Sequence, residues 1–140
     1  MNKYNAEGYP NPTAYGALSV IEKEERLAAR AARYRPLMYI CSPFSGDIPG
    51  NTAKAIRYSR FAVDSHAIPL APHLLFPLFM DEKTERELAM FMDMVLLGRC
   101  EELWVFGETV SCGMKAETEK ARKKNMSVRY FTDDLKEVTP

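Results

Sequence analysis

The chain has 140 residues and a formal net charge of +0, because 19 lysines and arginines balance 19 aspartates and glutamates. Hydrophobic residues make up 46% and charged residues 27%, a composition typical of one globular domain with a core. The balanced charge argues against a nucleic acid polymer as partner. No apolar run approaches the roughly 18 residues of a membrane span, so we expect no membrane contact.

The number and spacing of the cysteines indicate whether the protein works in a reducing or an oxidising compartment. The three cysteines, Cys41, Cys100 and Cys112, form an odd set without a C-x-x-C pair. The chain starts MNKYNAEGYP, which is not the pattern of a signal peptide. We therefore expect reduced cysteines and a cytoplasmic protein.

The N-terminal part reads as an arm followed by a helix. Residues 1–12 contain glycine and prolines, whereas residues 13–33 are rich in alanine, glutamate and arginine. This helix either packs on the domain or binds a second subunit. We expect residues 1–35 to form this arm and helix, and residues 36–140 to form one α/β domain.

Strands and helices alternate through the rest of the chain. Apolar runs predict strands at 37–41, 67–71, 103–106 and 127–131, and the prolines of the second suit an edge position. Helices are expected from Asn51 or Thr52, over 83–98 and over 111–125. This order predicts a three-layer, flavodoxin-like or Rossmann-like fold with a small parallel sheet of four to five strands, plus the extra N-terminal helix.

The stretch from Ser111 to Glu117 follows the third strand and opens a helix. Ser111 is a good N-cap, because its hydroxyl accepts from free amides of the first turn. Glu117 lies one turn after Gly113 on the same face, and long side chains lean toward the helix N-terminus. Its carboxylate is thus expected at the C-terminal edge of the sheet, where α/β proteins bind ligands. The alternative is a capped helix with one solvated glutamate.

Asp93 is the one polar residue in the run from Leu88 to Leu97. A carboxylate there is costly to bury without partners, so it points into a polar cavity or caps something local. Together with Glu117 it suggests glycosyl chemistry on a nucleoside or nucleotide. The small-residue loop Ser42–Gly46 and His73 are expected at the same sheet edge.

Other chemistries lack their motifs. Neither a P-loop nor a G-x-G-x-x-G turn occurs, and His66 and His73 lack zinc-ligand spacing. Cys112 with His73 is conceivable as a nucleophile and its base, but Cys112 is better explained as a packing residue. We therefore expect no cofactor and no metal ion.

The strings Tyr39 to Gly46, Pro69 to Leu74, and Glu101 to Gly107 with Ser111-x-Gly113 resemble the nucleoside 2-deoxyribosyltransferase superfamily. Within it the chain looks most like a small group of phage and mobile-element proteins with a domain-of-unknown-function label, of the DUF4406 or DUF7768 type. A remoter similarity is to 2′-deoxynucleoside 5′-monophosphate N-glycosidases.

The resemblance implies a retaining mechanism. Glu117 would be the nucleophile, Asp93 would assist departure of the base, and Tyr39 matches a tyrosine of the active site. Ser111 and Gly113 would hold the sugar or phosphate. The other implied substrate-binding residues are Ser42, Pro43, Phe44, Ser45, Gly46, Asn51, His73, Gly107 and Met114. Related enzymes share active sites across subunits, so a homodimer or larger homo-oligomer is expected.

Two departures from the family pattern concern specificity. The loop arginine that binds phosphate in the glycosidases is Ser45 here, and the aspartate that opens the third strand is Glu101. Arg57 or Arg60 are candidate substitutes for that arginine, although both also fit solvated surface positions. Preference for a monophosphate is therefore left open.

Overall fold

The computed structural model describes residues 12–140, with side chains from residue 16 onward. The expected arm lies outside these residues, except for Pro12. The chain divides between Tyr34 and Arg35 into two compact units. In the first unit, α1 (Pro12–Arg33) occupies the expected helical segment and ends with two arginines in its last turn, where positive charge complements the helix dipole.

The second unit is built on a five-stranded sheet with the order β2-β1-β3-β4-β5. The strands β1 (Leu37–Cys41), β2 (Ile68–Leu70), β3 (Glu102–Phe106) and β4 (Ser127–Phe131) are parallel. A short strand, β5 (Glu137–Val138), pairs antiparallel with β4. The predicted α/β class and strand number are confirmed, and β2, which contains Pro69, lies at the predicted edge of the sheet.

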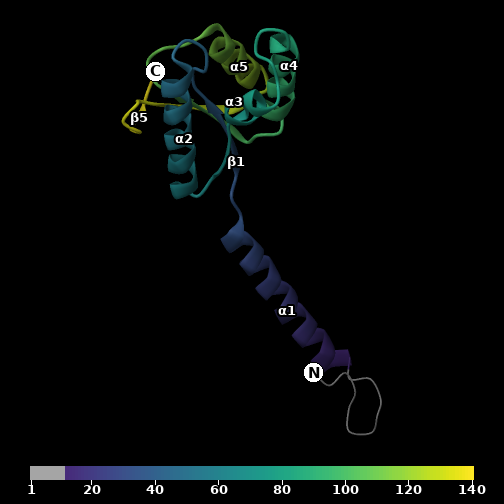
Figure 1. Cartoon of the computed structure of the whole chain (residues 1–140). Coiled ribbons are helices and arrows are strands. Elements are labelled where there is room, and N and C mark those ends of the chain that lie inside the picture. The colour runs from purple at the N-terminus through teal and green to yellow at the C-terminus, as the bar shows by residue number, and fades with distance from the viewer. Residues whose placement is uncertain (1–11) are drawn as a thin grey trace. The chain divides into compact units, whose positions relative to one another are not determined.

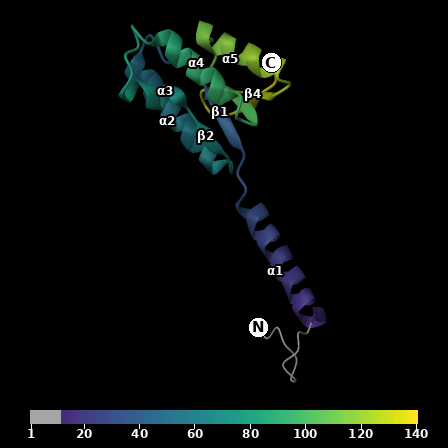
Figure 2. The same cartoon turned by 90° about the vertical axis from the view of Figure 1, so that its right-hand side faces the viewer.

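Helices cover both faces of this sheet (Figure 1, Figure 2). One face packs against α2 (Ile48–Asp64), and the other against α4 (Arg86–Leu97) and α5 (Cys112–Lys123). Between β2 and α4 the chain forms α3 (Pro72–Leu75) and a 3-10 turn, η1 (Phe76–Leu78).

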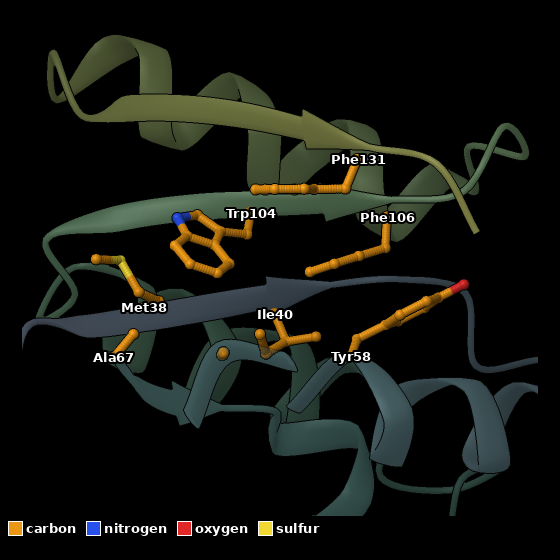
Figure 3. Packing of buried hydrophobic residues seen from close by; sticks show 8 residues of the cluster. Met38, Ile40, Tyr58, Ala67, Trp104, Phe106 and Phe131 are labelled. Atoms are coloured by element: carbon orange, nitrogen blue, oxygen red, sulfur yellow. The ribbon is translucent and has the colours of Figure 1, made fainter. Parts of the chain in front are cut away.

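Successive side chains of β1 and β3 point to opposite faces of the sheet, so each face has a hydrophobic core of its own. On the α2 side, Ile40, Trp104 and Phe106 pack with Phe131 and Tyr58, and the Phe106 ring stacks on Tyr58 at 4.3 Å between centroids (Figure 3). The alternate residues of the same strands face α4 and α5, and they include Tyr39, Cys41, Leu103 and Val105. Near-complete burial on both faces explains why β1 and β3 read as continuous apolar runs.

The starts of α2 and α4 differ most from the sequence prediction. Helix α2 begins at Ile48 rather than at Asn51 or Thr52, because the Asp47 side chain accepts from the Gly50 amide at 3.2 Å. Pro49 falls in the first turn, where the missing N–H costs nothing, so proline and glycine there did not mark a loop. Helix α4 begins at Arg86, after a turn in which Asp81 accepts the amides of Lys83 and Thr84.

The strand order places a topological switch between β1 and β3. From β1 the chain passes through α2 to the edge strand β2, and it then returns on the other face to β3. The loops after β1 and β3 therefore diverge to opposite faces at the C-terminal sheet edge. Open α/β sheets bind ligands in the crevice at this point.

Candidate active site

A cavity of about 150 Å³ opens at this edge, on the side of α4 and α5. It contains nine of the residues that the sequence singled out. They come from the loop after β1, from α3, from α4 and from the start of α5: Ser42, Phe44, Ser45, His73, Asp93, Ser111, Gly113, Met114 and Glu117. Four separate segments of the chain thus contribute to one cavity.

Glu117 is a largely buried carboxyl group that lines the cavity from α5. The Tyr39 hydroxyl, from β1, donates to its Oε1 at 3.2 Å. Burial raises the pKa of Glu117 to about 7, aided by the nearby charge of Asp93, whereas hydrogen bonds from Cys41 and Tyr39 act in the opposite direction. The carboxyl group is therefore held in place and is close to half ionised at neutral pH.

Asp93 reaches the same cavity from α4. Its Oδ1 atom is buried and has no hydrogen-bond partner among the described residues. Burial raises the pKa of this carboxyl to about 6. Of the two interpretations of Asp93, the structure agrees with the polar cavity, since no local cap uses this oxygen. An unpartnered carboxyl oxygen in a cavity is a group poised to meet a ligand or a water molecule.

The loop after β1 is held by two side chains. His73 Nε2 lies 3.0 Å from Ser42 Oγ, and burial lowers the pKa of His73 to about 4, so the ring is neutral at pH 7. The Asn51 amide donates to the carbonyl oxygens of Phe44 and Ser45, each at 3.1 Å. Gly46 adopts a φ of 96°, which favours glycine, and lies outside the cavity lining.

The start of α5 forms the opposite wall. Ser111 caps the helix, because its Oγ accepts the Met114 amide at 3.3 Å. A Cβ built on Gly113 would meet just the Ser111 Oγ, at 3.9 Å. The backbone of this first turn is therefore open to the cavity.

Other predicted residues lie behind or beside this cavity. Tyr39 does not line it but contacts it through Glu117. Pro43, Asn51 and Gly107 line a second cavity of about 200 Å³, which shares Ser42 and Ser45 with the first. The loop after β1 is thus a wall between two cavities.

The proposed substitutes for the missing loop arginine are wrong. Arg57 donates to the Asp133 carbonyl oxygen, and Arg60 pairs with Asp64 at 2.7 Å on the surface. Neither lines the cavity that holds Glu117. Glu101 precedes β3 at the N-terminal edge of the sheet, away from the site, where its amide donates to the Leu37 carbonyl.

Sequence reasoning missed the outer half of the cavity. Its wall is completed by Phe76, Pro77, Met80, Asp81, Glu82, Arg86, Ala89 and Met90. The helical spacing back from Asp93 to Met90 and Arg86 was a signal that could have identified two of them, since residues three and four apart share a face.

Residues 12–140 include no helix that is both long enough and apolar enough to cross a bilayer. In the same part of the chain, no three histidine, cysteine, aspartate or glutamate side chains are grouped so as to hold a metal ion.

The strand order and the helices on both faces define a three-layer α/β domain, with a cavity beyond its switch point. The chain belongs to the family described as "Domain of unknown function (DUF7768)", whose match covers residues 36–131. This part of the predicted resemblance is confirmed.

A solved structure with a similar fold is described as "2-desoxiribosyltransferase from Leishmania mexicana". The TM-score is 0.53 and the sequence identity is 14%; the match covers 69% of this chain and 64% of that one. This chain thus corresponds to a little under two thirds of the neighbour's length, and the likeness shows the fold alone. No curated protein matches the sequence.

Proposed function

We propose that the protein breaks or exchanges the N-glycosidic bond of a nucleoside or nucleotide, with Glu117 as the nucleophile. The observation that carries the proposal is the position of Glu117, whose carboxyl group is largely buried, lines the cavity and accepts a hydrogen bond from Tyr39. A solvated surface glutamate would have neither the burial nor the partner. The fold it shares with a deoxyribosyltransferase supports the same chemistry.

The reaction follows from the two carboxyl groups. A Glu117 oxygen attacks the anomeric carbon as the carbon–nitrogen bond breaks, and the bonding electrons go to the base. Asp93, whose pKa is raised to about 6, is protonated in a minority of molecules near neutral pH and in most of them below pH 6, and in this form it gives its proton to the departing nitrogen. Water, or the nitrogen of a second base, then attacks the sugar carbon and passes its proton to the Asp93 carboxylate. The bond between Glu117 and the sugar breaks, and its electrons return to the Glu117 carboxylate.

The remaining groups bind the sugar end. Ser42 and Ser45 offer hydroxyls from one wall, and Ser111 with the first turn of α5 offers hydroxyl and amide groups from the other. A helix N-terminus with an open backbone suits hydroxyl or phosphate oxygens. His73 is a positioning residue, because it holds the Ser42 hydroxyl.

The second candidate is a binding module that retains a nucleotide-derived ligand without turnover. The raised pKa of Glu117 favours it, because a protonated carboxyl at neutral pH donates a hydrogen bond instead of attacking carbon. In that case Glu117→Gln keeps ligand affinity and no product forms.

The test is incubation of the pure protein with a panel of nucleosides and nucleoside monophosphates, followed by chromatography for free base. We expect base release, or exchange when a second base is added, and loss of both in Glu117→Gln. No release from any substrate, with wild type equal to the variant, would contradict the proposal.

Self-association and cytoplasmic location complete the proposal. Large apolar side chains are exposed on α4 and on the segment before it, among them Phe79, Leu88 and Phe91. We propose that a second copy covers them, and light scattering after gel filtration measures this directly. All three cysteines are free, as in a reducing compartment.

A further inference from the structure

One face of α4 leads from the buried end of the cavity to its rim. Asp93, Met90 and Arg86 all line the cavity, and they are spaced three and four residues apart. Such spacing aligns them on one side of the helix. Seven residues correspond to about 10 Å along the axis. A ligand that meets Asp93 at one end can therefore reach Arg86 at the other.

Arg86 is the one cationic side chain among the described residues that line this cavity. Within residues 12–140, no hydrogen bond or ion pair engages its side chain. Of the acids near it in sequence, Asp81 accepts amides of its own turn, Glu85 Oε1 accepts the Asp81 amide at 3.0 Å, and neither Glu82 nor Glu87 forms an ion pair with it. The guanidinium group is thus available to a ligand.

The wall between Asp93 and Arg86 is apolar. Met90 lies between them on α4, and Phe76 and Met80 line the cavity from the segment before that helix. Flat apolar walls suit an aromatic ring system. The sugar-binding groups lie instead on α5 and on the loop after β1. The base of a substrate would therefore extend along α4, with its far edge toward Arg86.

We propose that Arg86 donates hydrogen bonds to the edge of the base farthest from the sugar and thereby selects bases that carry a ring carbonyl. This inference rests on the function proposed above. A guanidinium group has five donors and no acceptor. It bonds well to the carbonyl and ring nitrogen of an oxopurine, a pairing that arginine makes with guanine in DNA. Adenine presents an amino group at the same position, so donor would meet donor.

The test compares 2′-deoxyinosine with 2′-deoxyadenosine, which have nearly the same size and differ at the oxo or amino group. We expect wild type to favour deoxyinosine about 10- to 100-fold in kcat/KM, as for one hydrogen bond to a charged group. Arg86→Met should bring this ratio near one by lowering the deoxyinosine value. Arg99→Met, an exposed arginine outside the cavity lining, is the matched control and should keep the ratio.

Calorimetry of both nucleosides with Glu117→Gln separates this inference from the proposed function. A binding preference for deoxyinosine that Arg86→Met removes supports the role of Arg86 even if no base is ever released. A ratio near one in wild type, a preference for deoxyadenosine, or equal loss of both substrates in Arg86→Met overturns it. Absence of binding by either nucleoside overturns both proposals.

Discussion

The Tyr39 hydroxyl donates to Glu117 Oε1 across 3.2 Å, and this bond joins the central strand β1 to helix α5. The two residues are 78 positions apart in the chain. Tyr39 is 1% exposed, so its hydroxyl has no competing water, and burial together with the Glu117 charge raises its pKa well above the ordinary value. Tyr39 is therefore a neutral donor that orients Glu117 at any physiological pH.

Removing the Tyr39 hydroxyl should lower the rate of base release more than it lowers the stability of the fold. Tyr39→Phe keeps the buried ring but leaves Glu117 without the bond that lowers its pKa. We expect kcat/KM for base release to fall about tenfold or more, and the pH optimum of its profile to move to higher pH. Tyr130→Phe is the matched control, since the Tyr130 hydroxyl accepts from Arg122 away from the cavity. Equal activity of both variants would argue against the role of Tyr39.

The pH dependence of kcat/KM should be bell-shaped. Glu117 must be ionised to attack, and its pKa is about 7; Asp93 must be protonated to help the base leave, and its pKa is about 6. Their joint requirement places the maximum between these values, with apparent pKa values that belong to the pair. In Asp93→Asn the alkaline limb should vanish, and the acidic limb should move to higher pH, because it then reports the ionisation of Glu117 alone and no longer the lower first apparent pKa of the pair. A profile that is flat from about pH 5 to about pH 8 would contradict this.

Gly113→Ala should separate folding from binding. The added methyl meets the Ser111 Oγ at 3.9 Å, an ordinary contact, and alanine in a helix is favoured over glycine by roughly 0.5–1 kcal/mol. Chemical denaturation should thus show equal or greater stability. The same methyl projects into the cavity, so KM should rise several-fold. Unchanged KM would mean that the sugar does not approach this turn.

Glu117→Gln should stabilise the protein at alkaline pH. The folded-state pKa of Glu117 is about 7 against an ordinary value of 4.5, so the folded chain holds this proton more tightly than the unfolded chain does. The contribution to stability is complete below the ordinary value and is lost as pH rises through about 7. The free energy of unfolding should exceed that of wild type by about 1–3 kcal/mol near pH 8, and the gap should close near pH 5. A variant that is less stable than wild type at pH 8 would show that interactions with the ionised Glu117 carboxylate fully offset the free-energy cost of burying it.

Local sequence patterns predicted the strands well where both faces of a strand are buried, because such strands consist of apolar residues. The strand at 127–131 has the predicted bounds, and β1 and β3 read clearly because both of their faces are covered. The start of α2 was misread, because a proline and a glycine in a first turn look like a loop until the cap at Asp47 is seen. Strand β5 was missed, since two exposed residues depend on pairing with β4 and on the Arg129–Glu137 ion pair.

The sequence predicted the part of the cavity that is lined by Asp93 and Glu117. Asp93 stood out as one acid in an apolar run, and Glu117 stood out by its spacing from Gly113; both line the same cavity. The outer half depends on how the segment from Phe76 to Met80 folds against α4, which no local pattern reports. Arg86 therefore escaped notice, whereas Arg57 and Arg60, closer to the loop in sequence, were proposed wrongly.

The most direct measurement is peptide mass spectrometry of the protein, acid-quenched during turnover of a deoxynucleoside. The account predicts a deoxyribosyl adduct on the Glu117 side chain, absent from Glu117→Gln and lost when water or a second base is given time to react. Base release at the wild-type rate by Glu117→Gln, or an adduct on a different residue, would contradict the claim that Glu117 is the nucleophile.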